Sequence, residues 1–323
     1  MNPCAIGIDL GGSNIKGVAV TSEGNTLLQA NVGFEAEEKM IWADKIRGLV
    51  HQIRHEAEPA KPATKAPGLQ DHPPIGVSAP GLAAPDRRSI FHMPTRLQGL
   101  EGLDWSQFLG LGCPVPVLND AHAALIGECW IGAARGLKNV IMLTLGTGVG
   151  GAVMVDGRLL RGHLGRAGHL GHICLEPGGS LDVTGTPGSL ENAIGNCTIQ
   201  ARTHGRFHST HELIAAYRAG DSLARSIWLK SVRDLACAIV SFINILDPEA
   251  IVIGGGIARS GDALFQPLQR FVDEIEWRPA GHQVKILPAQ LGEFAGAYGA
   301  ARTALSLGYS RRALELGSPL VSG

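Results

Sequence analysis

Apolar residues near the start of the chain fall into two short runs that flank a glycine-rich turn. Residues 4–8 and 15–20 are mostly aliphatic, and Gly11-Gly12-Ser13-Asn14 separates them, which predicts a β-hairpin. The pattern recurs at mid-chain, where residues 140–145 and 152–155 flank the glycines of residues 146–151. Two such hairpins raise the hypothesis of an internally duplicated strand–turn–strand unit, with two unrelated hairpins as the alternative.

Three longer segments carry apolar residues at helical spacing. Residues 39–56, 121–130 and 223–246 are therefore predicted to be helices. The last of them ends at Asp247-Pro248, because proline cannot continue a helix.

Short apolar runs between these helices predict further strands. One of these strands begins at Ile75, and the other two cover residues 114–118 and 250–253. The Pro/Ala/Lys-rich stretch of residues 55–74 is expected to be a mobile surface loop, since the strand pattern resumes directly after it. Strands and helices alternate along the chain, which indicates the α/β class.

Composition narrows the class of protein. The 323 residues are 45% apolar, enough for the core of one or two domains, and 28 Lys+Arg balance 29 Asp+Glu. A net charge of -1 without a dense basic block argues against nucleic acid as a partner.

Apolar runs are too short for a bilayer span, and no basic region precedes the first one, so a cytoplasmic location without membrane contact is expected. Six scattered cysteines without C-x-x-C predict reduced, mostly buried thiols.

The glycine turns are the first candidates for chemistry. Gly146-x-Gly148-x-x-Gly151 matches a dinucleotide fingerprint, but a strand follows it where a Rossmann site needs a helix. Exposed N–H groups in such a turn offer a concavity for an anion, with an ordinary hairpin turn as the alternative. Asp9 precedes the first turn, where a carboxylate suits Mg²⁺ directly or through water.

A carboxylate also marks the junction between a strand and a helix at Leu118-Asn119-Asp120. Loops at such junctions commonly present catalytic groups. The alternative is that Asp120 caps the helix, a frequent use of aspartate.

Together these segments resemble the ROK sugar kinases (repressor, open reading frame, kinase), part of the actin, hexokinase and heat-shock chaperone superfamily. The resemblance covers nearly the whole chain and rests on GIDLGGSNIKG, IGVSAPG, LNDAHAALIGE, LTLGTGVGGAVMVDG, GHLGHICLEPGG and ILDPEAIVIGGGI. It implies the two-lobed actin-like ATPase fold, with duplicated mixed β-sheet domains around a central cleft. Residues 1–118 with 303–323 are expected to form the N-terminal lobe, to which the C-terminal helix returns, and residues 119–302 the C-terminal lobe.

The resemblance also implies ligands and roles. Asp120 matches the general base that takes the proton of the attacking sugar hydroxyl, and Asp9 matches a Mg²⁺ ligand. ATP is the implied phosphoryl donor. Sugar-binding positions are Asn119, His169, His172 and Glu191; nucleotide-binding positions are Gly11, Gly12, Ser13, Asn14, Lys16, Gly146, Thr147, Gly148, Gly254, Gly255 and Gly256.

The chain departs from the family pattern at a sugar-binding position. Where the family usually has G-E-x-G-H, residues 168–172 read Gly-His-Leu-Gly-His, so His169 stands in place of a glutamate. A neutral imidazole offers one donor and one acceptor instead of a pair of acceptors. Glucose is therefore expected to be a poor substrate.

A second departure concerns zinc. The family usually binds zinc through its Gly-His histidine and the cysteines of C-x-C-G-x-x-G-C-x-E, but the matching stretch here is DVTGTPGSLE, residues 182–191. All three thiolates are missing, and a substitute set of His169, His172 and Cys174 lacks a fourth ligand. No zinc is expected.

The sequence thus predicts an ATP- and Mg²⁺-dependent carbohydrate kinase that acts on a hexose or amino sugar, with a homodimer suggested by the resemblance. One alternative is a sugar-sensing protein without catalysis, since the family includes transcriptional repressors. Such repressors carry a DNA-binding segment before the first phosphate motif, and Asp9 leaves no room for one in this sequence. The other alternative is a pseudokinase or assembly partner.

Overall fold

A computed structural model describes residues 5–35, 40–57, 73–93 and 97–315. The chain divides into two compact units. Unit 1 comprises Met1–Arg135, Arg161–Arg166 and Glu293–Gly323, and unit 2 comprises Gly136–Leu160 and Ala167–Gly292. Cys4 and most of the predicted Pro/Ala/Lys-rich loop lie outside the described residues.

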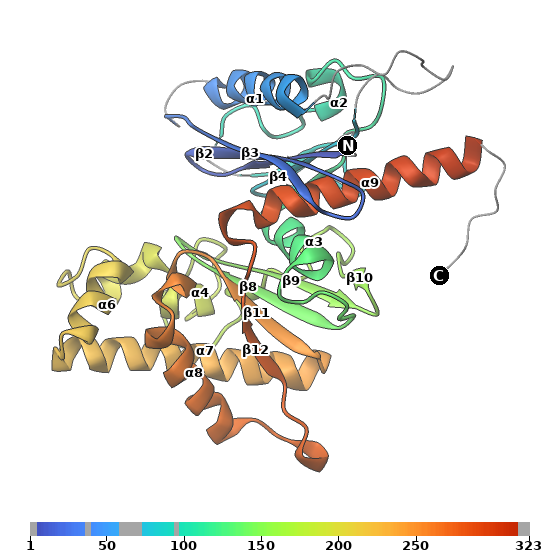
Figure 1. Cartoon of the computed structure of the whole chain (residues 1–323). Helices are drawn as coiled ribbons and strands as arrows, with labels where there is room; N and C mark the ends of the chain where they lie inside the picture. The colour runs from blue at the N-terminus through green and yellow to red at the C-terminus, as the bar shows by residue number, and fades with distance from the viewer. Residues whose placement is uncertain (1–4, 36–39, 58–72, 94–96, 316–323) are drawn as a thin grey trace. The chain divides into compact units, whose positions relative to one another are not determined.

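Unit 1 is built on a five-stranded mixed sheet (Figure 1). Its elements in chain order are β1 (Ala5–Leu10), β2 (Asn14–Val20), β3 (Thr26–Gly33), α1 (Ile41–Ala57), β4 (Ile75–Ala79), β5 (Leu82–Ala83), β6 (Ile90–His92), α2 (Trp105–Phe108), β7 (Val117–Asn119), α3 (Asp120–Ile131) and α9 (Ala295–Glu315). The strand order of the sheet is β3-β2-β1-β4-β7. β1 pairs antiparallel with β2 and parallel with β4.

Helices cover both faces of this sheet. On one face α1 buries Trp42, Ile46 and Ile53 in a core shared with β1, β2 and β4. On the other face α9 packs on β1 and β4, and it also packs on α3 (Figure 1). The helix approaches so closely that a Cβ added at Gly7 would collide with the Ala297 carbonyl oxygen. Glycine in β1 therefore sets how deeply α9 sits on the sheet.

Unit 2 repeats the architecture. Its elements are β8 (Val140–Leu145), β9 (Val149–Val155), β10 (Arg158–Leu159), the 3₁₀ helix η1 (Leu170–His172), α4 (Leu190–Ile194), η2 (Asn196–Thr198), α5 (Ile199–Arg202), α6 (Thr210–Arg218), α7 (Ser222–Leu246), β11 (Ala250–Gly254), η3 (Ile257–Ser260), α8 (Asp262–Ile275), η4 (Pro279–Gly281) and β12 (Lys285–Pro288); η5 (Gly292–Phe294) leads into α9. The strand order is β10-β9-β8-β11-β12.

The two sheets share one topology. In each, the first strand pairs antiparallel with the second across a glycine turn and parallel with the fourth. The fourth strand then pairs parallel with the edge strand. The predicted duplication is therefore confirmed and extends from the hairpin to the whole five-stranded sheet.

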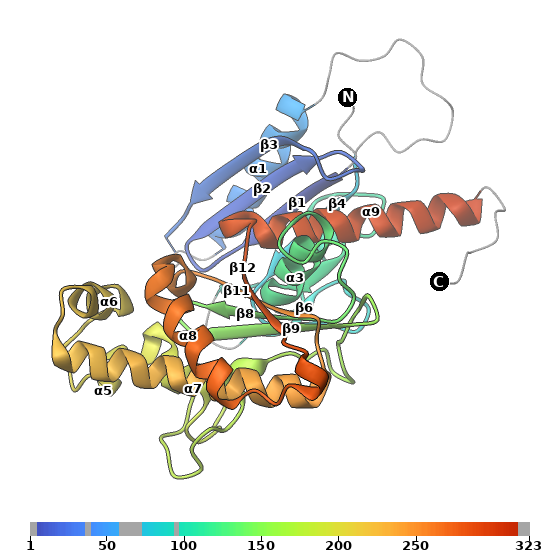
Figure 2. The same cartoon turned by 60° about the horizontal axis from the view of Figure 1, so that its bottom comes forward.

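The core of unit 2 lies between its sheet and two long helices. α7 and α8 pack side by side against the sheet (Figure 2). Trp228 of α7 is fully buried, and its indole N–H donates to the Ala263 carbonyl at 2.8 Å. A buried tryptophan with its polar atom paired fixes the register of the two helices.

Most predicted elements are present with small shifts. α1, α3 and α7 fall where helical spacing predicts them. β7 begins at Val117 instead of residue 114, since Pro114 and Pro116 cannot donate to a ladder. Both α3 and α9 belong to unit 1, where they pack on each other.

The exposure of the cysteines differs from what the sequence predicts. The prediction of mostly buried thiols is wrong: Cys174, Cys197 and Cys237 are exposed, and Cys113 and Cys129 are partly buried. These cysteines lie on helix surfaces and loops, where a small side chain is tolerated without being drawn into the core. Among the described residues no helix is both long and apolar enough to cross a bilayer.

Candidate active site

Asp9 lies near the end of β1, where it faces polar groups from two neighbouring strands. In the ladders it pairs with Lys16 of β2 and Ser78 of β4. The Ser78 hydroxyl donates to Asp9 Oδ1 at 2.6 Å. Burial raises the pKa of Asp9 to about 6, although the Ser78 hydrogen bond and the Lys16 charge lower it; the Asp120 charge raises it further. A cation near this carboxylate would favour its charged form.

The turn after β1 is held by its own backbone. The Gly11 N–H donates to the Asn14 carbonyl at 2.8 Å, and the Phe34 N–H donates to the Ser13 carbonyl at 2.9 Å. Gly12, Ser13 and Asn14 are exposed at the tip. Lys16 follows in β2, with Nζ 4.0 Å from Glu293 Oε2 of the same unit. The turn thus presents a short exposed segment beside Asp9 and Lys16.

Asn119 and Asp120 lie at the start of α3, and the sequence left open whether Asp120 caps this helix. Asn119 is the N-cap of α3, since its Oδ1 accepts the N–H groups of Ala121 (3.0 Å) and His122 (3.3 Å). Its amide nitrogen donates to the Gly81 carbonyl at 3.0 Å. Asp120 is the first residue of the helix and is exposed. The capping alternative for Asp120 therefore fails, because its neighbour does the capping.

The second glycine turn, between β8 and β9, is held by a buried carboxylate. Glu191 of α4 is 8% exposed, and its Oε2 accepts the Val149 N–H at 2.9 Å. A Cβ at Gly148 would collide with this carboxylate oxygen, so glycine is needed there for the contact. The carbonyls of Gly146 and Thr147 accept the N–H groups of Asn196 (3.0 Å) and Cys197 (2.7 Å). Three residues from α4 and η2 fix the turn.

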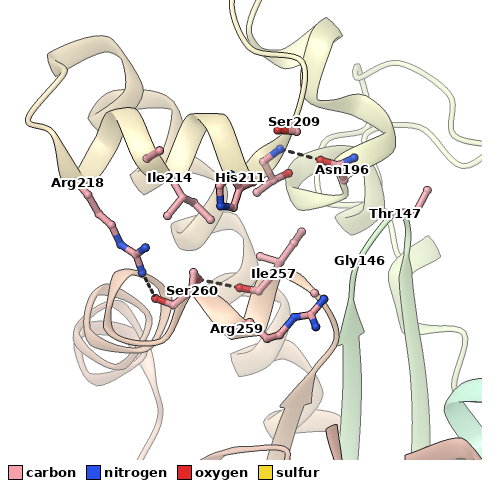
Figure 3. A pocket seen from close by; sticks show the side chains of 13 residues that line it. Gly146, Thr147, Asn196, Ser209, His211, Ile214, Arg218, Ile257, Arg259 and Ser260 are labelled. Atoms are coloured by element: carbon pink, nitrogen blue, oxygen red, sulfur yellow. Dashed lines mark hydrogen bonds between the residues drawn. The ribbon is translucent and has the colours of Figure 1, made fainter. Parts of the chain in front are cut away.

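A cavity of about 570 Å³ in unit 2 opens beside this turn (Figure 3). Its lining joins the turn, the start of α6 and the segment after β11. Gly256 lines the pocket directly, whereas Gly254 ends β11 and Gly255 is in the left-handed region, with φ +89°. The lining residues are Gly146, Thr147, Asn196, Ser209, Thr210, His211, Ile214, Ala215, Arg218, Gly256, Ile257, Arg259 and Ser260.

The pocket wall carries one polar atom that lacks a protein partner. Thr210 is 3% exposed, and its hydroxyl has no hydrogen-bond partner among the described residues. The hydroxyl oxygen has almost no accessible surface, so it does not face the cavity. Two other polar groups of the wall are paired: the Thr210 N–H donates to Asn196 Oδ1 (2.7 Å), and Arg218 Nη2 donates to the Ser260 carbonyl (2.7 Å; Figure 3).

Sequence motifs did not point to the α6 side of this pocket. Ser209 and Glu212 do form the S-x-x-E spacing that marks a helix start, and the Glu212 N–H donates to Ser209 Oγ at 3.1 Å. That signal locates the helix but not its role. Arg259, three residues after Gly256, was also missed because a lone arginine after a glycine run carries no specific pattern.

His169 and His172 flank the short helix η1 of unit 2. His169 is the residue before the helix and is partly buried. His172 ends it, and its Nδ1 lies 2.8 Å from Oδ2 of Asp182, whose side chain is fully buried. The structure thus separates the predicted residues by unit. Unit 1 holds Asp9, the first turn, Lys16, Asn119 and Asp120, and unit 2 holds the second turn, Gly254–Gly256, His169, His172 and Glu191.

Over the described part of the chain, no three His, Cys, Asp or Glu residues come together in a group fit to hold a metal ion. Of the residues considered as a substitute zinc site, Cys174 is exposed, and His172 Nδ1 lies 2.8 Å from Asp182 Oδ2.

Comparison with known proteins identifies the family. A model of the ROK family matches residues 5–306. Glucokinase from Thermotoga maritima is 32% identical over 320 residues, covering 92% of this chain and 95% of that protein. The solved ROK hexokinase from Thermus thermophilus has a TM-score of 0.75 at 28% identity, over 95% of this chain and 99% of that one. A ROK glucokinase from Streptomyces griseus, in complex with glucose and AMPPNP, has a TM-score of 0.73 at 28% identity, over 94% and 99%. The chain belongs to the ROK family.

Proposed function

We propose that this protein is a carbohydrate kinase that transfers the γ-phosphoryl group of ATP to a hydroxyl of a hexose or amino sugar. The family and its glucokinase relatives support a sugar kinase. The observation that carries the nucleotide part is the unit 2 pocket, where the second glycine turn, the start of α6 and Gly256 line one cavity.

The nucleotide is proposed to lie in this pocket with its base and ribose between α6 and the segment of residues 256–260. Gly256 adds no side chain to the wall, and Ser209, Thr210 and His211 at the start of α6 line the same cavity. The phosphates are proposed to run toward Gly146 and Thr147, whose turn carries N–H groups and a hydroxyl suited to anions. Gly11–Asn14 and Lys16 of unit 1 are separately proposed to bind phosphate.

Mg²⁺ is proposed to bind at Asp9, directly or through water. The residues fit a hard cation: a carboxylate and a serine hydroxyl lie 2.6 Å apart at adjacent strand ends. When bound, the ion would spread the negative charge of the transferring phosphoryl group. Lys16, in the next strand, adds a positive charge on the same side of the sheet.

Asp120 is proposed as the general base. Its carboxylate is exposed at the first turn of α3, and the Ala121 N–H donates to its Oδ1 at 2.8 Å, which orients the group. A carboxylate so placed accepts the hydroxyl proton as the oxygen attacks phosphorus. Because Asn119 is the N-cap of α3, capping does not compete with this role.

The sugar is proposed to be bound by Asn119, His169, His172 and Glu191. Asn119 donates one amide hydrogen to Gly81 and retains a second for a sugar hydroxyl. Glu191 uses Oε2 for Val149, which leaves Oε1 as an acceptor near the second turn. The two histidines differ from a glutamate-based pocket, so the preferred sugar is proposed to differ from glucose.

The test is an ADP-release assay across a panel of aldohexoses, ketohexoses and amino sugars, with ATP and Mg²⁺. We expect sugar-dependent ADP release for at least one member and formation of the matching sugar phosphate. A protein that binds a sugar from the panel, by calorimetry, without releasing ADP would instead be a sensor or pseudokinase.

A further inference from the structure

The loop of residues 180–189 is organised around one buried carboxylate. Asp182 lies between Leu181 and Val183, which are 69% and 85% exposed, while its own side chain is fully buried. A loop that turns a charge inward and two aliphatic side chains outward reverses the usual preference. Hydrogen bonds must therefore offset the cost of removing the carboxylate from water.

Those hydrogen bonds are present and come from four residues. Asp182 Oδ1 accepts the Thr184 N–H (2.8 Å), the Thr184 hydroxyl (2.8 Å) and the Thr186 N–H (3.0 Å). Its Oδ2 lies 2.8 Å from His172 Nδ1, and the Ser189 hydroxyl also bonds to the carboxylate. Burial alone would raise the pKa of Asp182, but these hydrogen bonds lower it well below its ordinary value, so the group is ionised.

The members of this cluster occupy the positions of the family's zinc ligands. When C-x-C-G-x-x-G-C-x-E is laid on residues 182–191, the three cysteines fall on Asp182, Thr184 and Ser189. The fourth member, His172, stands at the Gly-His histidine. All four positions converge in space, because the other three bond to the Asp182 carboxylate.

An ionised carboxylate accepts hydrogen bonds and donates none. His172 Nδ1 must therefore carry a proton in this contact, and in the neutral imidazole the lone pair then lies on Nε2. A carboxylate behind a histidine commonly fixes tautomer and ring orientation in this way. Nε2 of His172 becomes an acceptor for a hydroxyl proton.

Ser189 extends the cluster to a second sugar-binding position. It is fully buried and is the N-cap of α4, with its hydroxyl accepting the Asn192 N–H at 3.3 Å. α4 carries Glu191, which holds the second glycine turn through Val149. One cluster thus orders both His172 and the helix that presents Glu191.

We propose that the hydrogen-bonded cluster of His172, Asp182, Thr184 and Ser189 replaces the zinc centre implied by the family motif, with Asp182 as the positioning residue that keeps His172 Nε2 an acceptor for a sugar hydroxyl. The sugar contact rests on the proposed kinase function. The cluster itself does not, so the two are tested separately.

The first test is Asp182→Asn. Asparagine keeps its oxygen for the donors from Thr184 and Thr186, so its N–H₂ group, which only donates, faces His172 Nδ1. Long-range ¹H–¹⁵N spectra of protein labelled at histidine nitrogen, assigned by loss of the signal in His172→Gln, are expected to show the proton on Nδ1 in the wild type. The variant is expected to move it to Nε2. A wild-type His172 with its proton on Nε2 overturns the proposal, whether or not the protein proves to be a kinase.

Kinetics give the second readout. Because an acceptor is lost from the sugar pocket, Asp182→Asn is expected to raise KM for the best sugar roughly 5- to 150-fold. The KM for ATP is expected to remain the same. Thr184→Val is the matched control, since it removes one hydrogen bond to the same carboxylate without touching His172. Equal effects of the two variants on the sugar KM would assign Asp182 a purely structural role and contradict the proposal.

The third readout rebuilds the metal site. The variant Asp182→Cys/Thr184→Cys/Ser189→Cys, together with His172, supplies three thiolates and an imidazole. We expect it to retain about one equivalent of zinc by elemental analysis and to lose thermal stability on chelation. A folded triple variant that holds no zinc would show that the four positions are not an equivalent of a metal centre.

Discussion

At the scale of single residues, His169 is proposed to determine which sugars are accepted. It stands where the family pattern has a glutamate, and it lies partly buried before η1. A sugar that presents two hydroxyl donors at this position finds only one acceptor on a neutral imidazole. One hydroxyl is then left unpaired, at a cost of about 1–3 kcal/mol. We predict that the wild type uses glucose poorly and that His169→Glu raises kcat/KM for glucose relative to the preferred sugar. Steady-state kinetics over a sugar panel measure this.

The control for His169 is the ranking of the sugars, not the absolute rate. A general loss of activity lowers all values together, whereas a change of specificity reorders them. Efficient glucose phosphorylation by the wild type, or an unchanged order in the variant, would contradict the role proposed for His169.

Asp9 illustrates a conflict between function and stability. Its pKa in the folded protein is raised to about 6 from 3.8, so between those pH values the folded state holds a proton that the unfolded chain has lost. The free energy of unfolding must then fall as pH rises through that window. Above it the cost is about 1–3 kcal/mol, since the partly exposed carboxylate keeps some contact with water.

We predict that Asp9→Asn stabilises the metal-free, nucleotide-free protein by that amount at pH 7.5 and abolishes most activity. Asparagine keeps an acceptor for the Ser78 hydroxyl and carries no charge. Near pH 4.5 the gain should shrink, because Asp9 is then protonated in the folded wild type. Urea unfolding at both pH values measures the gain, and a variant that is less stable than the wild type at pH 7.5 would refute the claim that the ionised Asp9 carboxylate destabilises the fold.

At the scale of elements, the β8–β9 turn is locked by the contact between Glu191 and the Val149 N–H. Gly148→Ala places a methyl group against the Glu191 carboxylate, so we predict a loss of about 1–3 kcal/mol of stability and weaker nucleotide binding. Thermal unfolding without ligand, and titration with ATP, measure the two effects.

Gly146→Ala is the matched control within the same turn. A Cβ there meets nothing within 4 Å, and Gly146 does not require a positive φ. The ligand-free stability of this variant should stay within about 0.5 kcal/mol of the wild type. If both alanine variants were equally stable, the steric role of Gly148 would be wrong.

Periodicity was enough to predict the elements that bury a continuous apolar face. α7, with its run of buried residues from Trp228 to Ile243, and the hairpins of both sheets are examples. Short elements were not predictable: β10 has two residues and β12 has four, and both depend on pairing with a neighbouring strand. The α9 segment reads as alanines and glycines, and its burial comes from close packing on β1 and α3.

The candidate site, too, was predictable only in part. The glycine turns and Asn119-Asp120 could be predicted because they need special residues at fixed spacing. The division of labour in which Asn119 caps α3 was not visible, since both residue types are good caps. The Thr210 side of the pocket and the burial of Asp182 depend on contacts between segments distant in sequence, which no local pattern reports.

At the scale of the whole molecule, we expect zinc to be needed for neither stability nor activity, and Mg²⁺ to be needed for activity alone. We predict that a zinc-selective chelator changes neither the melting temperature nor the activity, because structural zinc contributes folding energy outright and its loss would be conspicuous. Removal of Mg²⁺ is expected to abolish activity while leaving the ligand-free melting temperature unchanged. Elemental analysis and thermal unfolding provide the measurements; one equivalent of tightly held zinc would contradict the prediction.

The central claim is that the protein moves a phosphoryl group from ATP to a sugar with Asp120 as the base. Asp120→Asn is nearly isosteric, and Asn119 still caps α3, so fold and ATP affinity should be preserved. ³¹P NMR of ATP, Mg²⁺ and the best sugar should show a sugar phosphate accumulating with equimolar ADP in the wild type. In Asp120→Asn the rate should be lower by roughly 10²- to 10⁴-fold. A wild type that yields only inorganic phosphate or no product, or a variant that keeps the wild-type rate, would contradict the account.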